Sequence, residues 1–430
     1  MALFTRAGDG TQPAPAVEPV PAVPATFPDA PAAGPSGRRT LDAHREFLLR
    51  HVHSEAPLGI ALLDAAGLAI CETIVADLDL PTFTSATVDG WALRASNLVG
   101  ASPHLPVILP VVDEIGPGPY RGAPLPKGTA VRVAAGAPVP EGADAVVALG
   151  EGLAVGDEVQ FTSEAAFGQN LRPAGSQIAD GTPLVTSGTV LTPRVLGLIA
   201  EVGHDKVLAR PRPRVVVLTA DATLVEPGLP LTRLDQTYDA CTTMLAAAAR
   251  ADGAQVFAAG IVAAEPKALA TTISEQLVRA DLLLLVAADD DLEAVFGAQD
   301  VLDVAEVDGF AGRLLFALVG AERSPVLVLP PGAVAAQLAY VCFGRPLVQR
   351  LAGADWPPLA EEPVELTVPV ATDPVLTRLV LARREGDEAR PLDALGAGTV
   401  ELAAANAVLV VPPGAGPLPA HVAVSCRSLD

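Results

Sequence analysis

The sequence predicts a multidomain protein of the α/β plus β class, with a doubly wound α/β domain and a C-terminal β-barrel-like domain. In residues 211–353, short apolar runs alternate with helical patterns, which indicates a parallel sheet covered on both faces. In residues 81–167 and 354–430, short β-type runs are separated by Gly and Pro, which is typical of small β domains. The chain has 430 residues, which is too long for one ordinary core, so several domains are expected.

Composition excludes several classes of partner and site. The net charge of −22 argues against nucleic acid and anionic membranes as partners. No apolar run reaches the roughly 18 residues of a membrane helix, and the N-terminus lacks a signal-peptide pattern, so we expect a cytoplasmic protein without membrane insertion. The cysteines Cys71, Cys241, Cys342 and Cys426 form no CxxC pair, so neither a zinc site nor a disulfide framework is indicated.

The first 38 residues differ from the rest of the chain. They are rich in Pro and Ala and predict a disordered, partly polyproline tail. Two roles remain open for residues 1–38, because such a tail can be an interaction arm or a passive extension.

Residues 39–80 and 168–210 are expected to form an elongated linker domain. Thr40 or Asp42 is placed to cap a helix over residues 44–51, and residues 57–69 predict a second helix. In the second part of the linker, Thr192 and Pro193 form an N-cap and first-turn pair. The histidines His44, His51 and His53 have no ligand partner in the sequence, so we expect them to face solvent or cap the helix rather than bind metal.

The strands of the two β domains follow from the apolar runs. In the small β domain, residues 81–167, they are expected at 105–112, 129–133, 145–149 and 158–162. In the C-terminal β domain, residues 354–430, they are expected at 364–370, 376–383, 407–411 and 421–426.

The α/β domain, residues 211–353, has the most regular alternation. Its strands are expected at 214–219, 254–260, 281–286, 313–319 and 325–330, and its helices at 239–251, 266–280 and 334–351. The run at 281–286 is apolar throughout, which suits a strand buried on both faces of a parallel sheet.

Three aspartates, Asp289, Asp290 and Asp291, follow that buried strand after Ala287 and Ala288. Ligands of open α/β sheets bind outside the carboxyl ends of the strands, and phosphate sites there use glycine backbone N–H groups. Two like charges about 4 Å apart repel by about 4 kcal/mol at a surface-like dielectric, so a crevice lined by these carboxylates would repel phosphate. Two other interpretations are open: the aspartates solvate a loop or helix start, or they recruit a cation that bridges to an anion.

Several sequence blocks resemble a known family. Residues 80–94, Leu-Pro-Thr-Phe-Thr-Ser-Ala-Thr-Val-Asp-Gly-Trp-Ala-Leu-Arg, resemble the Pro-x-x-Asp-x-Ser-x-Met-Asp-Gly-Tyr-Ala signature of the molybdopterin molybdotransferase family (MoeA and the E domain of gephyrin). Residues 136–147 are similar to that family's Gly-Ala-Pro-x-Pro-x-Gly-Ala-Asp-x-Val-Val block, and residues 168–175 to its Gly-x-Asn-Ile-Arg-x-x-Gly block. Tyr238-Asp239 matches its Tyr-Asp pair, and the order of blocks agrees from residue 41 to the C-terminus.

The resemblance implies a homodimer of four-domain subunits in which the α/β domain is MogA-like. It also implies an activity, the insertion of molybdate into adenylylated molybdopterin with Mg or a similar cation. Asp89 and Asp239 are the retained family positions for catalysis, and Arg172 and Gly136 for cofactor binding. Asp289, Asp290 and Asp291 are the one metal-ligand candidate. Asp89-Gly90 is also an ordinary turn, Asp239 is also a helix N-cap, and Trp91 is expected to pack rather than stack on substrate.

The chain departs from the family pattern in the ligand loops. Ala135 stands where the family has Thr, and Gly175-Ser176-Gln177 stands where it has Gly-Glu-Asp. Thr223 replaces an acid, and Ala287-Ala288-Asp289-Asp290 replaces Gly-Gly-Val-Ser. Phe310 falls near the lysine of the family's Pro-Gly-Lys-Pro loop, and Pro331-Gly332-Ala333 replaces Pro-Gly-Asn-Pro.

Two functional hypotheses follow. In the first, the protein is a divergent, gephyrin-like member that is catalytically impaired and binds another protein, such as a cell-division protein or a membrane-receptor peptide, by analogy with gephyrin-like relatives. In the second, it keeps the family's transferase activity with relocated ligands. Molybdopterin, molybdate and Mg are expected as ligands only under the second hypothesis, so the sequence leaves the enzyme question open.

Overall fold

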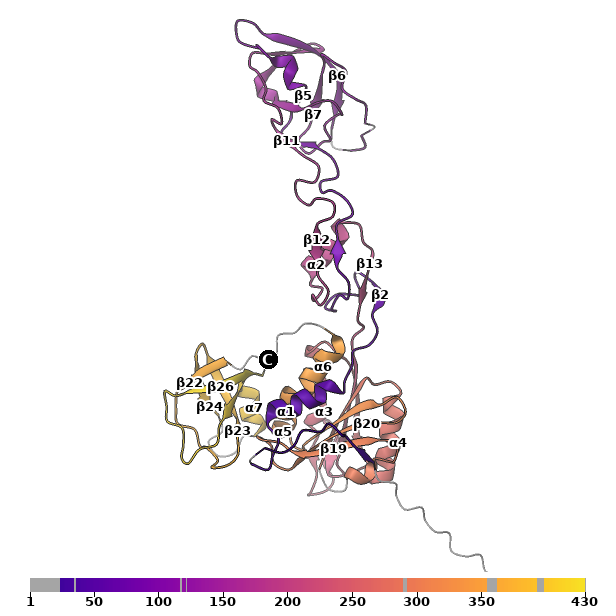
Figure 1. Cartoon of the computed structure of the whole chain (residues 1–430), viewed down its shortest axis with the longest axis vertical. Helices are drawn as coiled ribbons and strands as arrows, with labels where there is room; N and C mark the ends of the chain where they lie inside the picture. The colour runs from indigo at the N-terminus through magenta and orange to yellow at the C-terminus, as the bar shows by residue number, and fades with distance from the viewer. Residues whose placement is uncertain are drawn as a thin grey trace, which may run out of the picture. The chain divides into compact units, whose positions relative to one another are not determined.

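The computed structural model describes residues 24–34, 36–116, 118–120, 122–288, 292–353, 362–392 and 398–429. The chain divides into two compact units, and Figure 1 shows the elements of both. We call Met1–Pro57 with Arg210–Asp430 the sheet–barrel unit, and Leu58–Ala209 the motif unit. Each unit is considered by itself.

The sheet–barrel unit is built on a seven-stranded sheet. In spatial order the strands are β1 (Ala25–Thr26), β19 (Val301–Glu306), β20 (Arg313–Val319), β21 (Ser324–Leu329), β18 (Leu282–Ala287), β14 (Arg214–Ala220) and β17 (Gln255–Val262). All five strands predicted for this domain are present, while β19 and β1 were not predicted. The expected parallel sheet is mixed instead, because β20 runs antiparallel to both neighbours. The loop from Val319 to Ser324 is too short for a crossover, so β20 and β21 must form a hairpin.

Helices cover both faces of this sheet. They are α1 (Leu41–Arg50), α3 (Cys241–Ala251), α4 (Pro266–Leu277), α5 (Ala333–Ala339) and α6 (Arg345–Ala352), with α5 and α6 joined by a π-helical turn over Tyr340–Gly344. Alternate residues of β18 enter different cores, with Leu282 and Leu284 on one face and Leu283 and Leu285 on the other. The prediction of a strand buried on both faces is therefore confirmed.

The N-terminal segment adds an edge strand to the sheet. In β1, Ala25 and Thr26 pair in parallel with Val301 and Leu302 of β19. Phe27 is 6% exposed, and its ring lies 5.2 Å from Phe47 and 5.8 Å from Phe316 between centroids. The predicted disordered tail is therefore wrong for residues 24–34 and 36–38, because one aromatic side chain anchors the segment in the core. Residues 1–23 lie outside the described residues.

Helix α1 carries a histidine without polar partners. Thr40 caps the helix as predicted, accepting a hydrogen bond from the Ala43 N–H at 3.2 Å. His44 is fully buried, its ring lies 5.0 Å from Phe343, and neither ring nitrogen has a hydrogen-bond partner among the described residues. The expectation that His44 faces solvent or caps the helix is therefore wrong. Burial, followed by the charge of Arg39, lowers the pKa of His44 to about 3.

The C-terminal residues form a closed barrel, as the predicted fold class requires. Its strands are β22 (Glu362–Leu366), β24 (Glu388–Pro391), β23 (Arg378–Glu385), β25 (Ala407–Val411) and β26 (Ala423–Ser428). Strand β24 and helix α7 (Thr399–Ala404) were not predicted. Among the described residues, no helix has both the length and the apolarity that a membrane span requires.

The motif unit begins with a small two-layer segment. Strand β2 (Leu58–Ala61) pairs antiparallel with β13 (Lys206–Ala209), and β3 (Ile74–Val75) pairs with β12 (Pro183–Val185). Helix α2 (Pro193–Glu201) starts after Thr192, as predicted. The helix predicted over residues 57–69 is absent, because pairing with β13 overrides the helical propensity of this Ala- and Leu-rich stretch.

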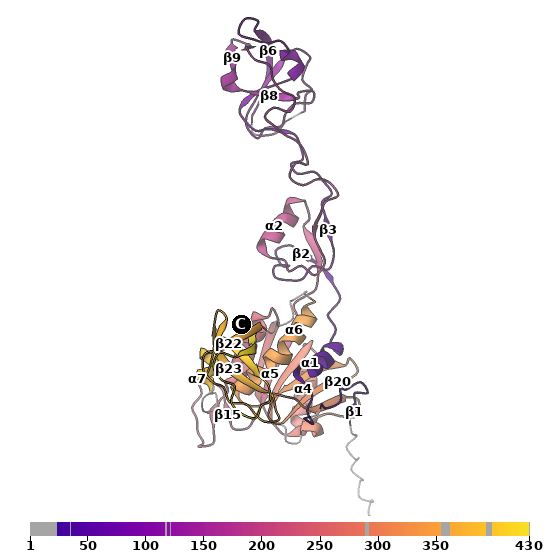
Figure 2. The ribbon, with the colours of Figure 1, turned by 60° about the vertical axis from the view of Figure 1, so that its left-hand side comes forward.

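The rest of the motif unit is a six-stranded sheet, shown in part in Figure 2. Its order is β8 (Ala145–Ala148), β5 (Gly90–Leu93), β7 (Ala130–Val133), β6 (Val107–Ile115), β10 (Glu158–Phe161) and β9 (Gly152–Val155). The four strands predicted here are confirmed. Trp91 on β5 is 6% exposed and packs in the core of this sheet, as expected.

The anchoring role of Phe27 gives a first prediction. Replacing Phe27 with Ala removes a buried ring and should lower the free energy of unfolding of the sheet–barrel unit by about 3–5 kcal/mol. Urea unfolding followed by circular dichroism measures this change. The control is Phe167→Ala, because Phe167 is 83% exposed and should change stability by less than about 0.5 kcal/mol. Equal effects of the two variants would contradict the anchoring role.

The buried His44 gives a second prediction, on pH dependence. Its folded-state pKa of about 3 lies below the ordinary histidine pKa of 6.5, so between these values the unfolded chain binds a proton that the folded chain does not. Stability should therefore fall as pH decreases below 6.5, by up to about 1.4 kcal/mol per pH unit from this residue. His44→Leu should remove this part of the slope in urea unfolding between pH 7 and 5. His53→Leu, at an exposed position, should leave it unchanged.

Candidate functional site

A crevice lies where β14, β18 and β21 reach their carboxyl ends in the sheet–barrel unit. Its volume is about 320 Å³. The lining residues are Thr219, Ala220, Asp221, Thr223, Leu224, Thr237, Tyr238, Asp239, Ala240, Cys241, Val286, Ala287, Ala288, Pro331, Gly332, Ala333 and Thr399. The sequence predicted a ligand crevice after β18, and Ala287 and Ala288 do line it. None of these described lining residues is Lys or Arg.

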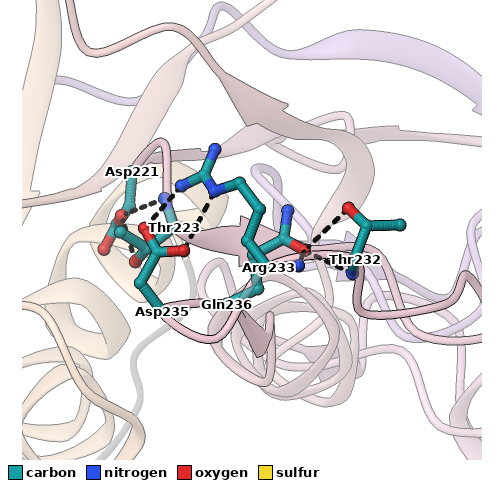
Figure 3. Close-up of polar contacts among 6 residues, drawn as sticks. All are labelled: Asp221, Thr223, Thr232, Arg233, Asp235 and Gln236. Atoms are coloured by element: carbon teal, nitrogen blue, oxygen red, sulfur yellow. Dashed lines mark hydrogen bonds and ion pairs between the residues drawn. The ribbon is translucent and has the colours of Figure 1, made fainter.

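One wall of the crevice is the loop between Asp221 and Asp239 (Figure 3). Two short strands, β15 (Leu224–Val225) and β16 (Thr237–Tyr238), pair in parallel and close the loop on itself. An Asp221 carboxylate oxygen accepts hydrogen bonds from the N–H and the hydroxyl of Thr223, at 2.8 and 2.7 Å. Thr223 occupies the position where the resemblance implied an acid, so its side chain donates to a carboxylate instead of supplying one.

The single basic residue of this loop is already paired. Arg233 binds Asp235 through two hydrogen bonds, 2.9 Å from Nε to Oδ1 and 2.6 Å from Nη2 to Oδ2 (Figure 3). These bonds raise the pKa of Arg233 and lower the pKa of Asp235. The side-chain Oε1 of Gln236 accepts hydrogen bonds from the N–H of Thr232 at 2.8 Å and of Arg233 at 2.9 Å, which fixes the backbone of this turn. Neither Arg233 nor Asp235 is among the residues that line the crevice.

Asp239 and Cys241 form the floor of the crevice near α3. Asp239 is 4% exposed and accepts a hydrogen bond from the Thr242 N–H at 3.1 Å. The N-cap of α3 is Ala240, so Asp239 stabilises the first turn from one residue before the N-cap rather than as the N-cap itself. The hydroxyls of Thr219 and Thr242 lie 2.9 Å apart below it. Burial, followed by the charge of Asp239, raises the pKa of the Cys241 thiol to about 11. Cys241 is therefore a neutral thiol at physiological pH.

In the motif unit, the three matched sequence blocks meet at one short ladder. Strand β4 (Ser85–Ala86) pairs antiparallel with β11 (Leu171–Arg172). The Gly136 N–H donates to the Ala86 carbonyl at 2.8 Å, where Gly136 has a φ of +79° that favours glycine. Blocks that are distant in the sequence thus form one cluster of loops.

The candidate site residues in this cluster of loops form hydrogen bonds with other residues of the motif unit. An Asp89 carboxylate oxygen accepts a hydrogen bond from the Ala135 N–H at 2.8 Å. Arg172 Nη2 donates to the side-chain Oε1 of Gln177 at 2.9 Å. Gln177 stands where the resemblance implied an acid, so Arg172 has a neutral partner in place of a charged one.

The candidates are distributed between the two units. Asp89, Gly136 and Arg172 lie in the motif unit, and Asp239 lies in the sheet–barrel unit. Asp289, Asp290 and Asp291 lie outside the described residues. Phe310 is 6% exposed, packs 5.6 Å from Phe343 between ring centroids, and does not line the crevice.

Some crevice residues were not predicted as a site. Cys241 carries no motif of its own. It could have been found from the rule that residues at the helix starts that follow the carboxyl ends of parallel strands face the same crevice. Pro331, Gly332 and Ala333, which were expected near a ligand loop, do line it.

Comparison with known proteins agrees with the blocks. The family model for the MoeA N-terminal region (domain I and II) matches residues 39–203. Molybdopterin molybdenumtransferase 2 of Mycobacterium tuberculosis is 29% identical over 332 residues, which covers 73% of this chain and 80% of the relative. Molybdopterin molybdenumtransferase 1 of the same organism is 29% identical over 394 residues, covering 84% and 91%.

The fold agrees as well. A molybdopterin biosynthesis MoeA protein from Pyrococcus horikoshii superposes with a TM-score of 0.83 at 23% identity, covering 91% of this chain and 99% of the other. Residues 39–203 match the MoeA family, and the chain shares the fold of that MoeA protein over 91% of its length. The predicted family and the multidomain MoeA fold are both confirmed.

A bound magnesium ion would require a cluster of oxygen ligands. Among the described residues, no group of three or more His, Cys, Asp or Glu side chains is arranged to hold a metal ion. The crevice offers Asp221 and Asp239, and each already accepts a backbone hydrogen bond. The described residues therefore do not provide a resident magnesium site.

The raised pKa of Cys241 gives a third prediction. A shift from 9 to about 11 leaves about 100-fold less thiolate than an ordinary cysteine at pH 8, and Cys241 is 6% exposed. Iodoacetamide at pH 8 should modify Cys241 at least 100-fold more slowly than a small-molecule thiol, as measured by peptide mass spectrometry. The half-buried Cys71 is the internal control and should react faster. Equal rates at the two cysteines would contradict the assigned environment.

Proposed function

We propose that this MoeA-family protein has lost most or all of the molybdate-insertion activity and acts as a scaffold or accessory protein that binds another protein. The observation that carries the proposal is the charge of the crevice. A site that holds molybdate and a pterin phosphate must stabilise anions, which requires cations or free backbone N–H groups. The described lining residues include two carboxylates, Asp221 and Asp239, and neither Lys nor Arg.

The hydrogen bonds around the crevice also indicate that it binds anions poorly. The Thr223 N–H, which an anion could use, already donates to Asp221 at 2.8 Å. The Thr242 N–H donates to Asp239 at 3.1 Å. Removing one oxyanion donor from an enzyme costs roughly 3–4 kcal/mol in the barrier, so losing several such donors would reduce turnover by many orders of magnitude.

The retained family residues have structural partners that account for their presence. Asp89 fixes the loop at Ala135 by accepting its N–H at 2.8 Å, and the Asp89 carbonyl accepts the Leu149 N–H at 3.1 Å. Asp239 stabilises the first turn of α3. Arg172 is bound by the neutral Gln177. Retention of these residues therefore does not require retention of the chemistry.

A second candidate function is the family's enzyme activity. It is favoured by the names of the Mycobacterium tuberculosis relatives, which are molybdopterin molybdenumtransferases, and by Asp89 and Asp239. Under this alternative, the protein inserts molybdate into adenylylated molybdopterin, and the substrate would be held by residues other than those named above.

Complementation separates the two functions. In a bacterial strain without its own molybdotransferase, we expect this chain to restore less than about one-thousandth of the molybdoenzyme activity restored by Molybdopterin molybdenumtransferase 2 of Mycobacterium tuberculosis, because several anion-stabilising groups are absent. Normal activity at ordinary molybdate would refute the impaired-enzyme proposal.

Reversion variants provide the matched control. Ala135→Thr, Ser176→Glu with Gln177→Asp, and Thr223→Glu restore residue types implied by the family pattern. Activity that rises in these variants while protein levels stay equal would attribute the loss to those positions. The scaffold part of the proposal would lose its support if no protein co-purifies stoichiometrically with the chain from its native host.

A further inference from the structure

The six-stranded sheet of the motif unit has an apolar outer face. Strands β6, β10 and β9 lie side by side at one end of this sheet. In one rung Ile108 and Leu153 flank Gln160, and in the next rung Pro110 and Val155 flank Glu158. Direct cross-strand partners share a face, and so do residues two apart on one strand. Val112, at the register shift between Val111 and Asp113 of β6, is exposed as well.

These side chains are exposed to a degree that is unusual for their type. Ile108 is 53% exposed, Val112 49%, Leu153 64% and Val155 61%, while Leu109, Val159 and Phe161 between them face the core and are at most 5% exposed. An antiparallel sheet with one solvated face normally alternates apolar and polar residues. A sheet with apolar residues on both faces indicates an interaction surface. We call Ile108, Pro110, Val112, Leu153 and Val155 the β6–β9 patch.

The patch ends at an open strand edge. Strand β9 is the last strand of the sheet, and within the described part of the chain no strand pairs with its outer side. In an antiparallel ladder alternate residues direct both N–H and C=O away from the partner strand, so β9 presents unpaired backbone groups beside the patch. Natural edges are usually protected by Lys, Pro or a bulge, and β9 has the sequence Gly-Leu-Ala-Val.

The charged residues around the patch indicate which kind of partner would bind there. Strands β6, β9 and β10 contain no Lys or Arg, whereas Asp113, Glu114, Asp157 and Glu158 lie on them or in the turn between β9 and β10. The nearest strand with a cation is β7, where Arg132 pairs with Glu114 at 3.3 Å. A second copy docked through the same patch would place these acidic residues against one another, which is unfavourable at this surface. An extended segment that alternates apolar and basic residues is complementary.

We infer that the open edge of β9 binds an extended peptide segment of a protein partner, added as a strand, with apolar side chains against Leu153 and Val155 and with Lys or Arg that complement the acidic residues of β6, β10 and the turn between β9 and β10. Strand addition supplies affinity through the backbone and specificity through alternate side chains. This inference rests on the proposed function only in that it specifies where a scaffold would hold its partner.

The test uses defined peptides and the full chain. A fluorescein-labelled nine-residue peptide of alternating Val and Lys should bind measurably by fluorescence anisotropy. A block peptide of the same composition, and an alternating Val and Glu peptide, should bind at least tenfold more weakly. An alternating peptide with N-methylated valines should also lose at least tenfold, because it cannot donate to the strand edge.

Substitutions at exposed residues test where the peptide binds. Leu153→Asp and Val155→Asp alter exposed side chains of the edge strand β9 and should each weaken the alternating Val and Lys peptide at least tenfold, while Val278→Asp, at a residue that is 84% exposed in the sheet–barrel unit, should not. Unchanged binding in both patch variants, or equal binding of the block peptide, would overturn the inference. A sedimentation velocity shift to smaller species in Leu153→Asp would assign the patch to a second copy and also overturn it.

The peptide experiment is independent of turnover. If complementation restores molybdoenzyme activity and the peptide still binds, the proposed loss of activity fails and the inferred surface stands. If the peptide does not bind and complementation fails, the surface is wrong and the impaired-enzyme proposal stands.

Discussion

The parallel pairing of β14 with β18 is the constraint on which the sheet–barrel unit depends. The register runs from Val215 opposite Leu282 to Ala220 opposite Ala287, and every residue of β18 is buried. Because successive side chains alternate between faces, this one ladder contributes to both hydrophobic cores. It also fixes where the two strands end together, which places the chain after Ala220 beside the chain after Ala287. The crevice is therefore a consequence of strand register rather than of any residue in the loops.

Buried charged side chains connect the barrel to the helices that cover the seven-stranded sheet. Asp252, after α3, accepts a hydrogen bond from the Tyr340 hydroxyl at 2.5 Å and one from Arg345 at 3.1 Å. Arg345 also donates to the Leu429 carbonyl at 2.7 Å, so the last strand of the barrel is attached to the π-helical turn between α5 and α6. Burial raises the pKa of Tyr340, which keeps its hydroxyl as a donor. Since α5 begins at the crevice, the same network holds one wall of that site against the barrel.

The sequence predicted those features that local pattern controls. The apolar run of β18, the Thr192 cap and the closely spaced strands of both β domains are specified by neighbouring residues, so they were placed correctly. The predictions that were wrong concern features set by contacts between segments that are distant in the sequence. Strand formation at β2 depends on β13, the order at the N-terminus depends on the pocket that receives Phe27, and the direction of β20 depends on a short hairpin loop. The burial of His44 likewise depends on Phe343, about 300 residues further along the chain, which no local pattern encodes. The position of the crevice was predictable because the ends of the strands define it. The hydrogen bonds made by Thr223 and Arg172 could not be predicted from the sequence, because they depend on the three-dimensional structure.

The strand β1 has a consequence for how the protein is made. Its partner β19 is encoded far downstream, so during translation the segment around Phe27 leaves the ribosome long before Val301–Glu306 exists. Until then the aromatic neighbours of its ring that are nearby in sequence are Phe47 and His51, because Phe316 is synthesised still later. The N-terminal edge of the sheet is thus completed late in biosynthesis, although its residues are among the first to emerge, and chaperones have that whole interval in which to bind it.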